Sequence, residues 1–454
     1  MIKSALQAFR EKIRQTFDRE SKQLFKNSTW VFGANVLGVV LAFLRSILIA
    51  RGLGAEILGA YSVVVAFVLT VQEIIKLNVA LGVIKYGAHY VSEKRPDKLM
   101  ALLKGGVIAS QISAFVSVII IALLAKFTYH YFFDIPGLQQ FIIWYSIVCG
   151  FAFLDNIGRG TLKIYYKFKL NSIVQMIMDT FEFLMIAICI YLYPHNLTYF
   201  FWTVIITKFV NSLICNTAVL IELRKELGVY LKTKIAVLTE ERKEISHFII
   251  GHSFSNTLKT FMNQGDVLIL SWWSNSAAVG FYTVAKKLAY SVLAITDPLV
   301  TSIYPQLSHL VSQAKFQEAK TMLIKLTRLT LLPVTVFMVA AFFLKDQIIT
   351  TIYGKSYAPA ANSFFIHLIG AVQGSIFFWA LPLIQSLGLT AIRLRAYLLA
   401  IGLDLLVSWW LTPQFGAAGV AFGLLSANLL ISFLFIHASY LHIEKSINSS
   451  LSSI

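Results

Sequence analysis

Residues 45–61 read RSILIARGLGAEILGAY, and residues 266–282 read DVLILSWWSNSAAVGFY. The two stretches align without a gap, and the alignment places Gly59 on Gly280. Each stretch lies at the end of the first apolar segment in a set of six, and an even number of segments separates them, so both face the same way. A repeat of this kind predicts two parallel six-helix halves, which is typical of a transporter with two lobes around a central pathway.

The composition indicates a protein whose main solvent is lipid. Of its 454 residues, 57% are hydrophobic and only 13% are charged, and a soluble chain of this size could not bury so much apolar surface. The formal net charge of +17 is spread between the apolar runs. This pattern fits the cytoplasmic loops of a membrane protein and argues against nucleic-acid binding.

About twelve apolar runs have the roughly 20 residues needed to cross ~30 Å of hydrocarbon. They lie near residues 28–50, 58–77, 101–125, 139–157, 171–193, 198–222, 247–272, 281–305, 326–344, 362–387, 391–411 and 416–440. Lys and Arg concentrate in every second connection, which predicts that both termini are cytoplasmic. We therefore expect an all-α, polytopic protein of the cytoplasmic (inner) membrane, with about 12 transmembrane helices.

The domain organisation follows from these runs. We expect a cytoplasmic amphipathic segment at 1–27, a six-helix lobe at 28–222, a charged cytoplasmic linker at 223–246, a second six-helix lobe at 247–440 and a cytoplasmic tail at 441–454. In the first segment, apolar residues recur every three or four positions among basic ones. This spacing favours a helix on the inner membrane surface over a disordered basic tail.

The sequence carries no sign of an enzyme. The outer connections are short, the longest running from about Lys126 to Leu138, and none holds a set of catalytic carboxylates. There is no HExxH, P-loop or nucleophile elbow, and the three cysteines lie in apolar stretches without disulfide or metal-ligand spacing. We therefore expect no catalytic residues, no cofactor and no metal site.

Charged residues inside the predicted spans are the candidate functional residues, because a charge near the middle of a membrane helix costs ~2.5–3.5 kcal/mol. The repeat places Arg45 of the first half on Asp266 of the second. Arg45 lies in the outer third of its helix, so it either snorkels to the interface or lines a cavity. Asp266 is too short to snorkel, which favours a cavity or a partner such as Lys286 across the hairpin.

The other charges in or near the spans are Glu73, Lys76, Asp179, Glu182, Lys208, Lys259, Lys287, Asp297 and Asp404. Glu182 and Lys208 lie at similar distances from the loop that joins their helices, which favours a structural ion pair. Glu73 and Lys76 are spaced for a pair on one helix. Pro298, which has no N–H group to donate, predicts a kink in the eighth span.

Four motifs follow one another along the chain at characteristic spacings. They are ARGLG at 50–54 with GAYS at 59–62, Asp266 with GFY at 280–282 and the later Pro298 and Pro305, IYGKSYAPA at 352–360, and FGAAGVA at 415–421. Together they resemble the polysaccharide-exporter (O-antigen flippase-like) branch of the multidrug/oligosaccharidyl-lipid/polysaccharide exporter superfamily, over nearly the whole length. Ala55, where the family often has proline, and Leu58, where it often has phenylalanine, depart from that pattern.

The resemblance implies a flippase that moves a polyprenyl-pyrophosphate-linked oligosaccharide from the inner to the outer leaflet by alternating access. On that reading the cations that line the cavity and bind the headgroup are Arg45, Lys259, Lys286 and Lys287. The carboxylates that relay charge or couple transport to an ion are Asp266, Asp179, Glu182 and Asp404. The hinge or gating residues are Gly52, Gly54, Gly59, Gly280 and Pro298.

Other functions stay open. A cation-coupled multidrug exporter of the same superfamily would need carboxylates facing the cavity, whereas a positive wall would favour the flippase. Lipid II flippases carry fourteen spans, which makes that role less expected here, and a non-transporting assembly scaffold is a further alternative. The resemblance also implies membrane lipid and a polysaccharide polymerase or other assembly proteins as partners, and a monomer suffices for transport.

Overall fold

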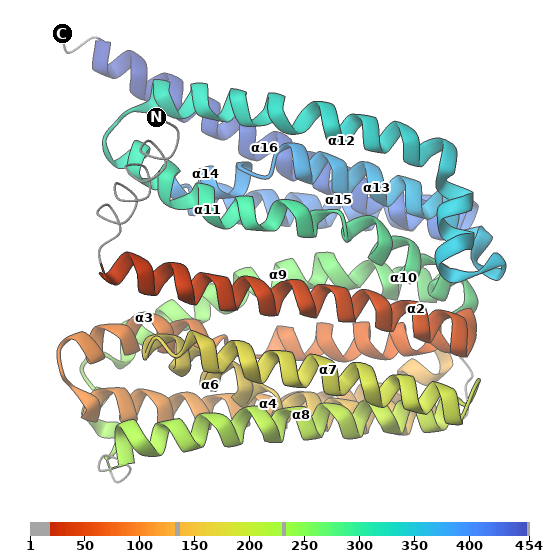
Figure 1. Cartoon of the computed structure of the whole chain (residues 1–454), viewed down its shortest axis with the longest axis horizontal. Coiled ribbons are helices and arrows are strands. Elements are labelled where there is room, and N and C mark those ends of the chain that lie inside the picture. The colour runs from red at the N-terminus through yellow and green to blue at the C-terminus, as the bar shows by residue number, and fades with distance from the viewer. Residues whose placement is uncertain (1–18, 132–136, 229–232, 452–454) are drawn as a thin grey trace, which may run out of the picture.

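The computed structural model describes residues 19–131, 137–228 and 233–451, and within them the chain is helical, with no strand. The expected amphipathic segment at 1–27 lies largely outside the described residues. Helix α2 begins and helix α16 ends at the same end of the bundle (Figure 1), as an even number of membrane crossings requires.

The first lobe begins with α2 (Arg19–Ile75), which holds the first two predicted spans. The chain turns back at Gly54 (φ 85°, ψ 172°), a backbone conformation that glycine adopts without steric cost. The remaining helices of this lobe are α3 (Val79–Ser92), α4 (Pro96–Tyr131), α5 (Leu138–Phe151), α6 (Phe153–Ile164), α7 (Phe168–Leu192) and α8 (Leu197–Leu227).

The second lobe follows a short 3₁₀ helix, η2 (Ile235–Leu238). Its elements are α9 (Arg242–Trp273), α10 (Ser276–Tyr290), α11 (Leu293–Ser312), α12 (Phe316–Tyr353), the 3₁₀ helix η3 (Lys355–Ala360), α13 (Ala361–Ile376), α14 (Ala380–Ser386), α15 (Thr390–Phe415) and α16 (Ala417–Leu451). Each of the twelve predicted spans therefore coincides with a helix, part of a helix or a pair of consecutive helices.

Within the described residues, eight helices are long and apolar enough to cross a membrane, or nine if a bent pair counts as one span. Thr29–Ile75 counts once although it contains two predicted spans. The predicted spans 247–272 and 281–305 are not among them, and these two carry Lys259, Asp266, Lys286 and Lys287. The difference from twelve therefore comes from these two charged spans and from the double span in Thr29–Ile75.

Several spans are broken. The fourth span of the first lobe divides at Ala152 into α5 and α6, and that of the second lobe bends by 44° between α13 and α14. The eighth predicted span is divided into two helices, but not at Pro298, where the sequence predicts a kink. That break lies earlier, between Tyr290 and Leu293, and Pro298 lies within α11, with its side chain outside the described part.

The two lobes share a large buried cluster at one end of the bundle. At the end where α2 turns, this cluster joins first-lobe residues such as Leu53 to second-lobe residues such as Leu288 and Tyr357, and we call this end the closed end. At the end that holds the termini, one cluster centres on Val83 of the first lobe and includes Ile245 of α9, and a separate cluster centres on Leu307 of the second lobe. At that end, α9 packs on the first lobe, whereas the rest of the second lobe has its own core.

Two glycines of the sequence repeat lie at the centre of this seal. A Cβ atom on Gly59 would lie 1.7 Å from the carbonyl oxygen of Ser276, and one on Gly280 would lie 2.0 Å from the carbonyl oxygen of Ala55. Helices α2 and α10 thus cross backbone to backbone through Ala55-x₃-Gly59 and Ser276-x₃-Gly280, a spacing of small residues that membrane helices use for close approach. The crossing is nearly symmetric because the two stretches are copies of one repeat.

Polar contacts from the ARGLG motif reinforce the closed end. Arg51 donates hydrogen bonds to the carbonyl oxygens of Thr351 (2.5 Å) and Ile352 (2.9 Å), which are unpaired acceptors in the last turn of α12. The Tyr357 hydroxyl of η3 donates to the carbonyl oxygen of Ala50 (2.9 Å). Three of the four motifs noted in the sequence therefore meet at this one place.

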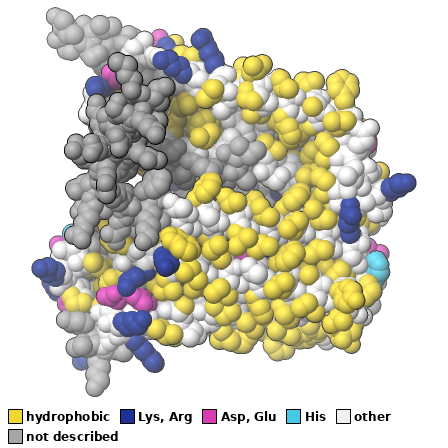
Figure 2. Space-filling view, in the orientation of Figure 1, with side chains coloured by type: hydrophobic (Ala, Val, Ile, Leu, Met, Phe, Trp, Pro, Cys, Tyr) yellow, Lys and Arg dark blue, Asp and Glu magenta, His cyan; other side chains and the backbone are white. Residues whose placement is uncertain are grey.

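The surface agrees with a lipid environment. Figure 2 shows hydrophobic side chains over most of the visible middle of the molecule and charged side chains gathered near its two ends. Large apolar side chains are exposed on that surface and elsewhere, among them Leu332, Phe343 and Leu406, each more than 70% exposed. The chain is a multi-pass membrane protein, and these side chains face hydrocarbon rather than water.

The linker fixes the start of α9 to the first lobe, although α9 belongs to the second. Glu241 accepts hydrogen bonds from Lys98 (2.5 Å) and Tyr90, and Glu244 accepts one from Tyr86 (2.9 Å). The bonds from Lys98 and Tyr90 hold the pKa of Glu241 below its ordinary value of 4.5. The charged form of Glu241 therefore stabilises this attachment.

This attachment predicts a pH dependence. A depressed folded-state pKa contributes stability that is present above the unfolded value of 4.5 and is lost as the pH falls through the folded value. We expect the melting temperature of Glu241→Gln to lie below that of the wild type at pH 7 and to approach it as the pH is lowered below 4.5. Glu240→Gln, at an exposed neighbour, should match the wild type throughout this range, and a constant wild-type advantage over Glu241→Gln would contradict the assignment.

The helix crossing predicts a strict size limit at Gly59. We expect Gly59→Leu to force α2 and α10 apart and to lower the free energy of unfolding by about 1–3 kcal/mol, the usual cost of overpacking. Thermal unfolding in detergent measures this. Gly33→Leu in the same helix is the control, because a Cβ there meets nothing within 4 Å; equal melting temperatures for the two variants would exclude the close crossing.

Candidate functional site

A group of charges lies where the two lobes meet, and we call it the junction cluster: Arg45, Asp179, Glu182, Lys208 and Lys287. Arg45 of α2 forms an ion pair with Glu182 of α7, with 2.5 Å between Nη1 and Oε1. The two side chains are 24% and 14% exposed, so the guanidinium lies mostly inside the protein. A cation in this position has a partner, which answers why Arg45 is tolerated within an apolar helix.

The other two cations of the cluster have no such partner. Lys208 of α8 interacts electrostatically with Glu182 and Arg45, and its Nζ lies 5.8 Å from the ring centre of Tyr145. Lys287 of α10, from the opposite lobe, interacts with the same two residues. The ammonium group of neither lysine forms an ion pair or a hydrogen bond with another residue that the structure describes.

The balance of charge in the junction cluster is positive. Asp179 interacts electrostatically with Glu182 and Arg45, and one of its carboxylate oxygens lies against α2, 2.8 Å from where a Cβ on Gly38 would be. The cluster therefore holds three cations and two carboxylates. Two of the cations can still accept an anionic ligand between the lobes.

A second group lies within the second lobe, and we call it the C-lobe cluster: Asp266, Tyr282, Lys286, His367 and Asp404. Lys286 donates to Asp266 (2.5 Å) and to the carbonyl oxygen of Asn263 (2.7 Å), and Tyr282 donates to the same carboxylate (2.5 Å). Asp266 is fully buried. The meeting of Asp266 and Lys286 across the hairpin, expected from the sequence, is confirmed.

Two members of the C-lobe cluster lack full partners. Asp404 of α15 accepts a hydrogen bond from Ser408 (3.0 Å) and interacts electrostatically with Asp266 and Lys286, but forms no ion pair with a described residue. His367 of α13 packs its ring against Tyr282, and its Nε2 atom is buried without a hydrogen-bond partner in the described part of the chain. The group can therefore exchange a proton or a cation.

The remaining predicted residues divide between these groups and other places. Lys259 is exposed on α9, and no hydrogen bond or ion pair between described residues links it to either cluster. Gly52 lies against α7: a Cβ placed on Gly52 would lie 2.2 Å from the side chain of Ile190. Gly54, Gly59 and Gly280 belong to the turn and the crossing at the closed end.

The pairing of charges was only partly predictable. Glu73 and Lys76 form the expected pair on one helix (3.4 Å). The expected pair of Glu182 and Lys208 is wrong, because Glu182 takes Arg45 as its partner.

Sequence reasoning also missed Asp155 of α6, which accepts hydrogen bonds from Ser212 and Asn216 of α8 (2.8 Å each). Its signal was a carboxylate inside the fourth predicted span.

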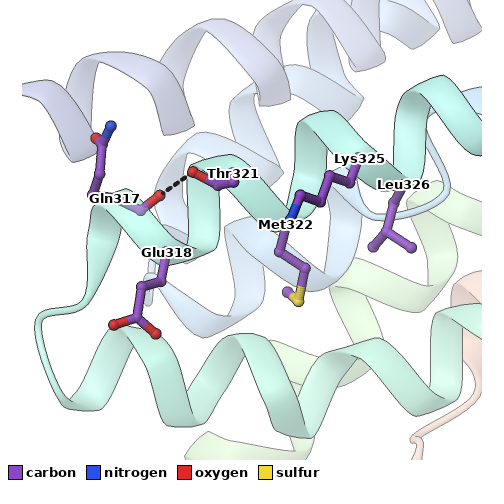
Figure 3. Close-up of a pocket in the computed structure, with 6 residues that line it drawn as sticks. All are labelled: Gln317, Glu318, Thr321, Met322, Lys325 and Leu326. Carbon is purple, nitrogen blue, oxygen red and sulfur yellow. Dashed lines mark hydrogen bonds between the residues drawn. The ribbon is translucent and has the colours of Figure 1, made fainter.

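The hollow drawn in Figure 3 is separate from both clusters. Its volume is about 550 Å³ and its lining residues, Gln317, Glu318, Thr321, Met322, Lys325 and Leu326, all belong to the first turns of α12. The dashed line joins the Thr321 hydroxyl, which donates, to the carbonyl oxygen of Gln317 (2.9 Å). One face of one helix offers no convergent set of groups, so this hollow is not the site.

Comparison with known proteins places the fold. The family described as "Polysaccharide biosynthesis protein" matches residues 64–362, about two thirds of the chain, and a search of curated proteins finds no match.

Among solved structures, an inward-facing multidrug resistance MATE family transporter of the MOP superfamily matches with a TM-score of 0.71 and 12% identity over 91% of this chain and 96% of that one. The lipid II flippase MurJ in an inward closed conformation matches with a TM-score of 0.68 and 14% identity over 94% and 91%. An outward-facing MATE family transporter matches with a TM-score of 0.60 and 12% identity over 93% and 96%. The chain therefore has the two-lobe, twelve-helix fold of this superfamily.

The junction cluster predicts a specific cost for losing its carboxylate. In Glu182→Gln the cations Arg45, Lys208 and Lys287 would lose their nearest neutralising group, and we expect the free energy of unfolding to fall by about 1–3 kcal/mol. Thermal unfolding in detergent measures this. Glu56→Gln, at an exposed site at the closed end, is the control. A Glu182→Gln variant as stable as that control would show that the cations do not depend on Glu182.

Proposed function

Because the chain belongs to the polysaccharide biosynthesis protein family, we propose that it is a flippase for a polyprenyl-pyrophosphate-linked oligosaccharide. It moves this lipid from the inner to the outer leaflet of the cytoplasmic membrane during surface polysaccharide synthesis. It is a transporter rather than an enzyme, it needs no cofactor, and a monomer suffices. A polysaccharide polymerase or other assembly proteins would take the product.

The observation that carries this proposal is the positive junction cluster. A pyrophosphate bears at least two negative charges, and Lys208 and Lys287 are cations without an ion-pair partner among the described residues. Arginine and lysine bind phosphate oxygens strongly where water is scarce. A wall of this charge attracts an anionic headgroup and repels a cationic drug, which favours the flippase over the multidrug exporter.

Each member of the cluster has a proposed role. Lys287 and Lys208 bind the pyrophosphate from opposite lobes, and Arg45 binds it while Glu182 holds the guanidinium in place. Asp179 limits the excess charge of the empty site. Lys286 was a headgroup candidate in the sequence, and we assign it instead to the C-lobe cluster, because Asp266 occupies it.

The cycle follows from how the lobes pack. The junction cluster lies on helices that meet at the closed end, whereas at the end that holds the termini the second lobe, apart from α9, has a core separate from that of the first lobe. With both termini cytoplasmic, this is a state that accepts the headgroup from the inner side. The higher TM-score with the inward-facing than with the outward-facing MATE transporter, 0.71 against 0.60, supports the same state. Release outward requires the crossing at Gly59 and Gly280 to open.

The C-lobe cluster is the proposed coupling site. Binding or loss of a proton or cation at Asp404 changes the field around the buried pair of Asp266 and Lys286. Lys286 and Lys287 are neighbours on α10, so a shift of this helix moves both clusters together. This gives a physical link between ion exchange in one lobe and headgroup binding at the junction.

A flipping assay tests the proposal. In proteoliposomes that contain a polyprenyl-pyrophosphate-linked oligosaccharide, we expect wild-type protein to move the lipid across the bilayer. Lys287→Gln and Arg45→Gln should each slow flipping by about 10- to 100-fold, because a hydrogen bond to a charged group contributes ~1.5–3 kcal/mol. Lys259→Gln removes an intramembrane cation outside both clusters and should flip at the wild-type rate.

Two outcomes would contradict this. Normal flipping by the folded Lys287→Gln and Arg45→Gln variants would remove the junction cluster from the headgroup site. Absence of flipping by the wild type, with uptake of cationic drugs by the same vesicles, would favour the multidrug exporter.

A further inference from the structure

An apolar groove lies between α4 of the first lobe and α9 of the second, and η2 covers one end of it. Its volume is about 640 Å³, within the roughly 300–1,000 Å³ range of ligand sites. Leu77 and Val79, at the junction of α2 and α3, form its floor. It shares no residue with the junction cluster or the C-lobe cluster.

The polar side chains of the groove are confined to one end. They are Thr239, Arg242 and Ser246, and they come from the end of η2 and the first turns of α9. The other side chains in its lining are apolar. The groove therefore has a head end, at the level where α9 begins, and a tail end that extends toward the middle of the bundle.

The tail end is open to the bilayer. Ile108, Ile112 and Ile250 line the groove and are each at least half exposed, so the surface around its opening is one that faces hydrocarbon. Water does not fill such a space favourably, and a hydrocarbon chain does. From Leu102 to Ile112 the lining of α4 rises about 15 Å, which is half of the ~30 Å hydrocarbon thickness and so corresponds to one leaflet.

The head end is suited to an anion. Arg242 forms no ion pair or hydrogen bond with another residue that the structure describes. Exposed Lys243 follows it in the sequence. Lys104 of α4, next to the lining residue Gly105, donates from its Nζ to the carbonyl oxygen of Thr233 (2.9 Å), just before η2. A planar guanidinium can bind phosphate oxygens through two parallel hydrogen bonds.

We propose that this groove binds an anionic phospholipid of the leaflet in which α9 begins, with an acyl chain along the isoleucines and its phosphate on Arg242. A phospholipid in its ordinary orientation places its phosphate at the membrane surface and its chain toward the midplane, as the groove requires. The substrate lipid fits less well, because its headgroup site lies toward the closed end, at the far end of the helices. The bound lipid lies between the lobes and becomes part of the surface on which they move.

Native mass spectrometry of the full-length protein in detergent tests this, with phosphatidylglycerol and phosphatidylcholine as the probes. We expect the wild type to bind one phosphatidylglycerol more tightly than phosphatidylcholine. Arg242→Gln should weaken phosphatidylglycerol binding about fivefold, since a basic residue near an anionic membrane surface contributes about 1 kcal/mol, and should leave phosphatidylcholine binding unchanged. Arg224→Gln, an exposed arginine in the last turn of α8, is the matched control and should bind like the wild type.

A second variant tests the tail end. A Cβ on Gly105 meets only Ile235, at 3.8 Å, so Gly105→Leu places its side chain in the groove and should weaken the binding of both lipids. Leucine also has a higher helix propensity than glycine, so α4 should remain folded, which thermal unfolding checks. If Gly105→Leu does not fold, Arg242→Gln and its control decide the question.

Three results would overturn the proposal. One is an equal loss of phosphatidylglycerol in Arg224→Gln and Arg242→Gln. Another is unchanged lipid binding by a folded Gly105→Leu variant. The third is displacement of phosphatidylglycerol by an equimolar polyprenyl phosphate, which would assign the groove to the tail of the substrate.

Discussion

The architecture depends on one close approach, the crossing of α2 and α10 at Gly59 and Gly280. The backbones meet there with no room for a Cβ on either glycine, so the contact is stabilised by dispersion and by weak Cα–H contacts to carbonyl oxygens rather than by side chains. Around this crossing, larger side chains of both lobes, such as Leu53, Leu288 and Tyr357, form one buried cluster. The crossing thus lies at the centre of the closed end, whereas at the other end the second lobe, apart from α9, has its own core.

Most of the fold was predictable because length and hydropathy determine it. A helix that crosses hydrocarbon must satisfy its own backbone groups, so apolar runs of the right length become helices wherever they occur. The breaks were less predictable. The division at Ala152 does not lie at a proline. The bend between α13 and α14 lies just before Pro382, which lacks the N–H group that would bond to the carbonyl oxygen of Phe378 within the break. Pro298, in contrast, does not mark the division of the eighth span. The prolines of the sequence therefore locate only some of the breaks.

The sequence identified most of the charged residues of the two clusters, but it also included Lys259, which lies outside both, and it gave only some of the pairs. Arg45, Asp266 and Lys287 are each a charge in a membrane helix, and the free-energy cost of such a charge identifies them as exceptional. The partner of Glu182 depends on how α7 rotates against α2 and α8, and periodicity does not give that rotation. Arg45, rather than Lys208, forms the ion pair with this carboxylate, so the structural pair expected for Lys208 does not form.

The repeat carries an arginine in the first lobe and an aspartate at the same position in the second, and the two residues belong to different clusters. Arg45 and Asp266 hold equivalent positions, yet Arg45 belongs to a cluster with excess cations and Asp266 to one with two carboxylates and a histidine. The two copies of one helix pair thus carry different charges, an excess of cations in one cluster and mainly carboxylates in the other. Helix α10 carries Lys286 of one cluster and Lys287 of the other. Gly280, where α10 crosses α2, lies on the same helix, so α10 connects the crossing to both charge clusters.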